Sequence, residues 1–370
     1  MRATALVTIL VLVLTACGGT APAAPPAPAG GAQPAVKATA PAPAQPAATS
    51  QPGAAGPTAA AGKPAAAQFQ YRLGINTTLQ HPNGVFSDTF KREVEKNSNG
   101  RISVQLFPNS QLGAEAEMVN AIKTGDLDLC ACTSALVAIL SPALQLGDLP
   151  FLFPDYATAR KVLDGDPGQS VLKTLEAQGV KGLAFGEIGF RGLLNNRKPV
   201  DTIADIRGMK VRVVENPLYV ATWRAVGANP VPMAWPEVYT GLQQGTIDGV
   251  DTNYAGMIDA KQYEVAKHLA VTNHNYTTSS LVMNLAKFNA LPQDLRKVVE
   301  DAAKVGGAES RKTAEMIDGG AVDTMQKQGV AVTKPPREAF VTAMKTVYDE
   351  FAPKIGPDII AKAQAMMGTR

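Results

Sequence analysis

The chain has 370 residues, of which 45% are hydrophobic and 18% charged, and its formal net charge is +3. The surplus positive charges lie in residues 1–68, which contain no Asp or Glu, so residues 69–370 carry 32 basic and 32 acidic side chains. The overall basic charge is therefore no argument for nucleic acid or a membrane surface as the partner, and no nucleic-acid partner is expected. The roughly 300 residues after the basic segment exceed one typical hydrophobic core and predict two domains.

Residues 1–17 have the features of an export signal. Arg2 precedes an apolar run over residues 5–14, which is too short for an ordinary membrane span and is typical of a secretory signal peptide. The letters LTAC, ending at Cys17, resemble the lipobox of bacterial lipoproteins, in which the cysteine becomes the first mature residue and carries lipid. Cys17 is therefore the expected lipidation site, and an ordinary signal peptide cut elsewhere is the alternative.

Residues 18–68 are mostly Ala, Pro, Gly, Thr and Gln. Such a segment cannot bury enough apolar surface to offset its chain entropy, so a disordered, semi-stiff tether is expected. No later hydrophobic run approaches 18 residues, which argues against a membrane span in the rest of the chain.

The first part of the body alternates between strand and helix patterns. Residues 71–76 and 102–106 read as strands, with a helix over 85–94 between them. A second helix is expected over 114–124, and "DLDLCACTS" at 126–134 gives a third strand.

The same alternation continues after residue 180. Strands are expected at 180–185, 189–195, 209–214 and 246–251, and helices at 217–227, 236–244, 292–328 and, for the most part, 336–367. The helix over 292–328 would exceed ~50 Å, long enough to cross more than one lobe. The alternation predicts α/β layers with largely parallel sheets, arranged as two units with a ligand site between them.

Cys130 and Cys132 are the two cysteines of the body. Alternate strand positions point the same way, so a strain-free disulfide between them is not expected. No nearby His or Cys completes a metal-binding set. They are expected to be buried core thiols.

The usual catalytic signatures are absent from the sequence. It contains no G-x-S-x-G, H-E-x-x-H or Walker A motif and only three histidines. Acidic residues that are close in sequence read as solvated faces, caps or turns: Glu115 with Glu117, Asp126 with Asp128, and Asp248 with Asp251.

Two arginines interrupt apolar strand patterns, Arg191 in "IGFRGLL" and Arg212 in "KVRVV". One interpretation is an internal salt bridge or an edge-strand charge that faces water. The other is that both face a cleft, where the forked guanidinium donors hold an anion such as a carboxylate.

Residues 71–350 resemble the solute-binding proteins of TRAP (tripartite ATP-independent periplasmic) transporters, the DctP-like family. The resemblance rests on six segments in the family's order: "SNGRISVQLFPNSQLG", "AIKTGDLDL", "DLPFLF", "DIRGMKVRV", "GANPVPMAWPEVYTGLQQGTIDGVD" and "YEVAKHLAVTNH". No single segment decides the matter, but their joint order is specific.

The resemblance implies an α/β, two-lobed type II periplasmic-binding-protein fold with a long helix spanning both lobes. Lobe I would comprise residues 69–188 and 278–318, and lobe II residues 189–277 and 319–370. It implies an extracytoplasmic, non-enzymatic protein that closes on a small organic acid and delivers it to the membrane subunits of a TRAP-type transporter. A receptor for a sensor system and, less favoured, an exported enzyme on the same fold are the alternatives.

The resemblance also implies site residues. Arg212 would form a salt bridge with the ligand's carboxylate, and Arg191 would also contact the ligand. Pocket positions match Asn76, Glu115 and Thr133. Thr252 and Asn253 stand where the family commonly has Asn-Pro, and Trp235 and Phe190 are candidate apolar walls or core residues. No tightly bound cofactor is expected; in relatives that bridge the carboxylate with a metal, the nearest candidates here would be Asp251 and Glu215.

Overall fold

The chain divides into two units, Met1–Ala60 and Ala61–Arg370. The computed structural model describes residues 67–368, all of them in the second unit. The expected signal peptide over residues 1–17, its lipidation site Cys17 and the tether up to residue 66 lie outside the described residues. No helix within 67–368 combines the length and the apolar character that a membrane crossing requires.

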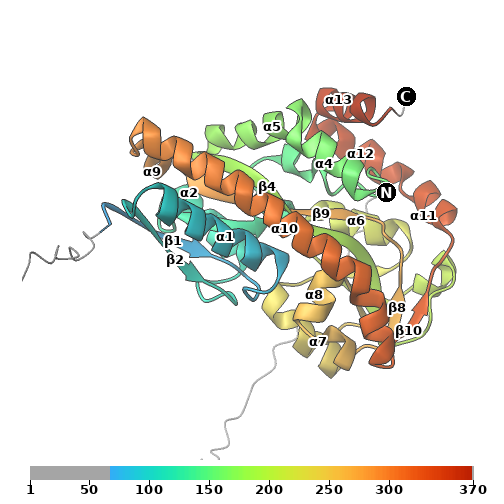
Figure 1. Ribbon diagram of the computed structural model, residues 1–370. Helices are drawn as coiled ribbons and strands as arrows, with labels where there is room; N and C mark the ends of the chain where they lie inside the picture. Colours follow the sequence, from blue (N-terminus) through green and yellow to red (C-terminus); the bar gives the residue numbers. More distant parts are fainter. Residues whose placement is uncertain (1–66, 369–370) are drawn as a thin grey trace, which may run out of the picture. The chain divides into compact units, whose positions relative to one another are not determined.

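Strands and helices alternate along the described residues (Figure 1). The strands are β1 Phe69–Gly74, β2 Ile102–Phe107, β3 Leu129–Thr133, β4 Val180–Asn195, β5 Lys210–Val213, β6 Asn229–Pro232, β7 Gly249–Asn253, β8 His268–Ala270, β9 Tyr276–Asn284 and β10 Ala331–Thr333. The α-helices are α1 Pro82–Asn97, α2 Glu115–Thr124, α3 Ser134–Val137, α4 Tyr156–Asp164, α5 Asp166–Lys173, α6 Pro217–Ala225, α7 Val238–Gln244, α8 Tyr254–Asp259, α9 Leu285–Asn289, α10 Gln293–Lys327, α11 Arg337–Ala343, α12 Lys345–Ile355 and α13 Pro357–Met367.

The strands form a mixed sheet with the order β2-β1-β3-β9-β4-β7-β5-β6, and β8 pairs with both β4 and β10. β1 is parallel to β2 and β3, and β5 is parallel to β6 and β7. At the centre, however, β9 is antiparallel to β3 and β4, and β4 is antiparallel to β7 and β8. The prediction of largely parallel sheets is therefore wrong for the centre. There, β9 is antiparallel to β3, β4 is antiparallel to β7, and β4 and β9 are antiparallel to each other.

β4 is a single strand of 16 residues, although two separate strands were expected from its sequence. Its first part, Val180–Phe190, pairs with β9, and its last part, Arg191–Asn195, pairs with β7 and β8. The register shifts between Glu187 and Gly189, where Gly189 has φ +113°. A glycine in this conformation forms a bulge without ending the strand. β4 thus belongs to both halves of the sheet, a first half with β1, β2, β3 and β9 and a second half with β5 to β8 and β10.

α10 confirms the predicted long helix almost to the residue. It has 35 residues and begins directly after Pro292, so its length is about 52 Å. Figure 1 shows it running beside α1 at one end and reaching α8 at the other, and it also packs on β4. Gly306 and Gly307 do not interrupt it. A Cβ atom at Gly306 would lie 2.7 Å from the carbonyl oxygen of Phe86, so the absent side chain allows α10 to approach α1 closely.

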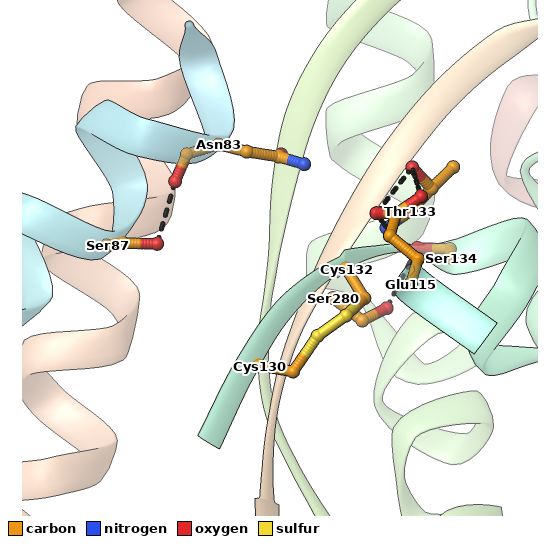
Figure 2. Close-up of a disulfide and its surroundings, with 8 residues drawn as sticks. All are labelled: Asn83, Ser87, Glu115, Cys130, Cys132, Thr133, Ser134 and Ser280. Carbon is orange, nitrogen blue, oxygen red and sulfur yellow. Dashed lines mark hydrogen bonds between the residues drawn. A yellow bond between two sulfur atoms is a disulfide. The ribbon is translucent and has the colours of Figure 1, made fainter. Parts of the chain in front are cut away.

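Cys130 and Cys132 are joined in a disulfide on β3 (Figure 2), so the prediction that they are free thiols is wrong. Their predicted burial is confirmed, since both are 0% exposed. Their Cα atoms lie 5.5 Å apart, which is closer than the roughly 6.6 Å spanned by two residues of an extended strand and falls within the range of disulfides. The local contraction of the strand brings two side chains of the same face together.

Candidate ligand-binding site

A cavity lies at the carboxyl ends of strands from both halves of the sheet. β1 and β3 contribute from the first half, and β5 and β7 from the second half. Crevices outside the carboxyl ends of strands are the usual ligand sites of open α/β sheets. The lining residues are Asn76, Thr77, His81, Asn83, Glu115, Thr133, Leu136, Ile188, Arg191, Arg212, Val214, Glu215, Ala234, Trp235, Thr252, Asn253 and Gly256.

Arg212 on β5 brings a buried positive charge to this cavity. It is 4% exposed, and its Nε and Nη2 donate to the carbonyl oxygen of Met233 at 2.9 and 2.8 Å. Its guanidinium also lies 5.6 Å from the ring centre of Trp235. Burial, together with repulsion from Arg191, lowers the pKa of Arg212 to about 10, so it stays charged at neutral pH. Within residues 67–368 no acidic side chain forms an ion pair with Arg212, and its charge therefore favours an anion in the cavity.

Arg191 also lines the cavity, but its charge has an internal partner. Its Nε lies 2.7 Å from Oδ1 of Asp251, and its Nη2 donates to the backbone oxygen of Asp251 at 2.6 Å. Asp251 also accepts a hydrogen bond from Nε1 of Trp223 at 2.8 Å and lies 3.2 Å from Nε2 of His274. Burial alone would raise the pKa of Asp251, but Arg191 and His274 hold it well below its usual range. Arg191 therefore combines an internal salt bridge with a place in the cavity lining, whereas Arg212 lines the cavity without an ion pair among the described residues; whether Arg191 also contacts a ligand stays a prediction.

The metal alternative named Asp251 with Glu215. The Asp251 carboxylate is engaged by Arg191, Trp223 and His274, and Glu215 lines the cavity as an exposed residue. No group of three His, Cys, Asp or Glu side chains suited to a metal ion occurs among the described residues.

Glu115 and Thr133, both named as pocket positions from the sequence, line the cavity and are hydrogen-bonded to each other. Glu115 is the first residue of α2, and its Oε1 accepts hydrogen bonds from the backbone N–H and the hydroxyl of Thr133 at 2.7 and 3.0 Å (Figure 2). Burial raises the pKa of Glu115 to about 7, although the bonds from Thr133 oppose the shift. The hydrogen bonds from Thr133 thus orient the carboxyl group, and near pH 7 both its protonated and its ionised form are present.

The remaining predicted polar positions also line the cavity. Asn76 follows β1 and is buried. Thr252 and Asn253 end β7, and Oδ1 of Asn253 accepts a hydrogen bond from the N–H of Gly256 at 2.6 Å. Asn253 therefore caps the start of α8, which explains a role for asparagine at this position. Trp235 begins a short 3₁₀ helix, Trp235–Glu237, and is a half-buried wall of the cavity.

Phe190 lies outside the cavity lining, so its prediction as a cavity wall is corrected. Its ring centre is 5.0 Å from that of Tyr156 and 5.4 Å from that of Tyr276. Neighbouring residues of a strand point to opposite faces, and Arg191 occupies the face toward the cavity. Phe190 consequently packs in an aromatic cluster on the other face of β4.

His81 and Asn83, at the start of α1, line the cavity but were not predicted. Nδ1 of His81 accepts a hydrogen bond from the N–H of Asn83 at 3.2 Å and caps the helix. Burial lowers the pKa of His81 to about 4, so the imidazole is neutral at pH 7. The letters HPNG at 81–84 do carry a signal, because proline at the first helical position marks a helix start.

A mixed sheet shared by two halves through β4, a helix that packs on both, and a charged cavity at their strand ends define the class of two-lobed periplasmic binding proteins. The chain belongs to the family described as bacterial extracellular solute-binding protein, family 7, which matches residues 73–354. Its relatives are binding proteins of the extracytoplasmic space rather than enzymes.

Relatives with assigned ligands cover most of the chain. The 2,3-diketo-L-gulonate-binding periplasmic protein YiaO of Escherichia coli K12 is 35% identical over 293 residues, which are 78% of this chain and 89% of that protein. The C4-dicarboxylate-binding periplasmic protein DctP of Rhodobacter capsulatus is 32% identical over 289 residues, 77% of this chain and 86% of that protein.

Solved structures give the same fold. A TRAP periplasmic solute-binding protein from Polaromonas sp. JS666, bound to D-erythronate, is 35% identical with a TM-score of 0.78, covering 80% of this chain and 98% of that one. A TRAP periplasmic solute-binding protein from Sulfurospirillum deleyianum, with bound succinate, is 30% identical with a TM-score of 0.76, covering 81% and 99%.

Proposed function

We propose that this chain is an extracytoplasmic solute-binding protein that captures a small organic acid between two lobes, with Arg212 holding the ligand's carboxylate. The observation that carries this proposal is the buried guanidinium at the cavity without an ion-pair partner within residues 67–368. A guanidinium pairs bidentately with a carboxylate, and two of its nitrogens are already oriented by the carbonyl oxygen of Met233. The carboxylate and sugar-acid ligands named for the relatives support the same class of ligand.

The captured acid is delivered to the membrane subunits of a TRAP-type secondary transporter, and the chain itself catalyses no reaction. Structural relatives described as TRAP solute-binding proteins support this role. The protein is anchored by lipid at Cys17, for which the lipobox-like sequence is the support. We assign residues 69–188 and 278–318 to lobe I, and residues 189–277 and 319–370 to lobe II. The bulge at Gly189, where β4 changes partners, supports the first boundary.

Thermal and chemical unfolding of the purified protein with a panel of organic acids tests the ligand class. Neutral sugars and amino acids serve as controls. A ligand at 100 times its Kd adds about 2.7 kcal/mol to the free energy of unfolding. We expect this stabilisation with one class of carboxylate and its loss in Arg212→Met. Stabilisation by a neutral sugar alone, or by an acid that acts equally on Arg212→Met, would refute the proposal.

A further inference from the structure

The charges around the cavity match a ligand with a single carboxylate. Arg212 is the basic lining residue whose charge is not neutralised by an ion pair within the described chain, because Arg191 is paired with Asp251. The acidic lining residues are Glu115 and Glu215. A second carboxylate on the ligand would therefore meet acidic side chains and no second unpaired cation of the lining, which selects against dicarboxylates.

Buried polar atoms between the end of β1 and the first turn of α1 lack hydrogen-bond partners within residues 67–368. They are Oδ1 of Asn76, Oγ1 of Thr77, and both Nδ2 and Oδ1 of Asn83. These residues are 8%, 4% and 1% exposed, and all three line the cavity. Buried polar groups in proteins are almost always hydrogen-bonded, so these atoms point to groups supplied by a ligand.

The turn that carries these atoms is fixed by its own packing. A Cβ atom at Gly84 would lie 2.2 Å from the carbonyl oxygen of Thr78, so the backbone of the turn lies directly against the start of α1. Figure 2 shows the amide of Asn83 pointing away from α1, on the side where Thr133 and Glu115 lie. Asn83 and Glu115 thus belong to two different walls of one cavity.

The type of polar atom distinguishes the possible ligands. Oδ1 of Asn76 and Oδ1 of Asn83 accept hydrogen bonds and lack donors, and Glu115, whose oxygens already accept from Thr133, accepts a further hydrogen bond when ionised. An ionised carboxylate offers only acceptors, and an alkyl chain offers neither. A hydroxyl group both donates and accepts, so it satisfies the oxygens as well as the Nδ2 group of Asn83.

We propose that the ligand is a hydroxylated monocarboxylate, and that Asn83 and Glu115 select it by hydrogen-bonding its hydroxyl groups while Arg212 holds its carboxylate. This inference rests on the proposed function and adds a ligand subclass to it. Structures of relatives contain both D-erythronate and succinate, so family membership leaves both subclasses open.

Isothermal titration calorimetry with matched ligands of equal chain length tests the proposal. The four-carbon set is erythronate, succinate, butyrate and erythritol, and the six-carbon set is galactonate, adipate, hexanoate and galactitol. In at least one set we expect the hydroxylated acid to bind about 100-fold or more tightly than the other three, because a site built for hydroxyl groups rejects analogues that lack them.

Asn83→Leu keeps the approximate volume and removes both amide atoms. We expect it to weaken binding of the hydroxylated acid by at least about tenfold while leaving the unsubstituted acid of equal length unchanged or improved. Glu115→Gln removes the negative charge and should reduce the ratio between the Kd of the diacid and the Kd of the hydroxylated acid. Asn97→Leu, at the exposed end of α1, is the matched control and should bind like the wild type.

The outcomes separate the subclass from the function. Tighter binding of succinate or adipate than of the hydroxylated acid would overturn the proposal and leave a carboxylate receptor standing. Binding of none of the acids would count against the proposed function itself. Preference for the hydroxylated acid that is unchanged in both Asn83→Leu and Glu115→Gln would overturn the assignment of these residues. Circular dichroism and thermal unfolding establish that each variant is folded, and the two variants lie on different helices.

Discussion

Replacing Arg212 separates a ligand-binding charge from a structural one. Arg212→Met keeps most of the apolar stem and removes the guanidinium, whose neighbours in the structure are the carbonyl oxygen of Met233 and the ring of Trp235. Truncating one partner of a buried, hydrogen-bonded charge pair costs about 2–5 kcal/mol. We therefore expect the Kd for the organic acid to rise by roughly 30-fold to several thousand-fold. Arg212→Lys should also bind poorly, because an ammonium group does not reproduce the planar fork.

Arg212→Met should not lower the stability of the ligand-free protein. Because Arg212 has no ion-pair partner among the described residues, the ligand-free fold carries the cost of burying its charge. The free energy of unfolding of ligand-free Arg212→Met should be unchanged or higher than that of the wild type. Calorimetry measures the Kd, and urea unfolding without ligand measures stability.

Arg191→Met is the matched contrast, since Arg191 is equally buried but bound to Asp251. Removing one partner of a buried ion pair destabilises a fold by about 3–5 kcal/mol. We expect a large loss of stability in Arg191→Met and none in Arg212→Met. A folded Arg212→Met that binds the acid with the wild-type Kd would refute the assignment, as would a loss of stability equal to that of Arg191→Met.

Three further changes test other parts of the structure. Arg160→Met should lower the free energy of unfolding by about 3–5 kcal/mol, because Arg160 donates hydrogen bonds at 2.9 and 2.8 Å to the fully buried carboxylate of Glu187. A variant that unfolds in urea like the wild type would contradict this. Burial raises the pKa of Asp148 to about 7, so between pH 4 and 7 the folded state holds a proton that the unfolded chain has released. The free energy of unfolding should therefore fall as the pH rises from 4 toward 7. Asp148→Asn should flatten that decline in urea unfolding between pH 4 and 7, and an unaltered pH profile would count against the raised pKa. Asp259→Ala removes hydrogen bonds that join Asp259 of the proposed lobe II to Thr78 of the proposed lobe I, which should disfavour the closed form. The ligand's Kd, measured by calorimetry, should therefore rise about three- to tenfold. An unchanged Kd would contradict this.

Signals that lie within one segment predicted the structure well. α10 was expected over 292–328 and spans Gln293–Lys327, because Pro292 fixes its start and the apolar positions repeat with helical spacing over many turns. Several of the polar residues named as site candidates line one cavity, while their contact with a ligand stays a prediction. Asn76 and Thr133 lie together because β1 and β3 run parallel and end at the same edge, and Arg212 reaches the same cavity from β5 in the second half of the sheet.

Features that depend on distant partners were not predictable. The salt bridge of Arg191 requires Asp251, which the fold brings next to it from β7. β4 looked like two strands because glycine usually signals a break, whereas Gly189 forms a bulge within a continuous ladder. β9 was not predicted as a strand because all of its residues are buried and its sequence shows no alternation. Asn83 resembled an ordinary residue of a helix start, and only its missing partners reveal it.

The position of β9 has a consequence for the order in which the chain can fold. Residues 279–283 of β9 pair with residues 129–133 of β3, and β9 also pairs with β4, so it fills the gap between two strands that precede it. While the ribosome has not yet supplied residue 276, both of those strands keep an unpaired edge. Pairing between segments so far apart in sequence is slow, and open edges promote aggregation. The newly made chain therefore spends most of its synthesis without a finished sheet, and a fragment that stops before residue 276 should aggregate rather than form a stable half.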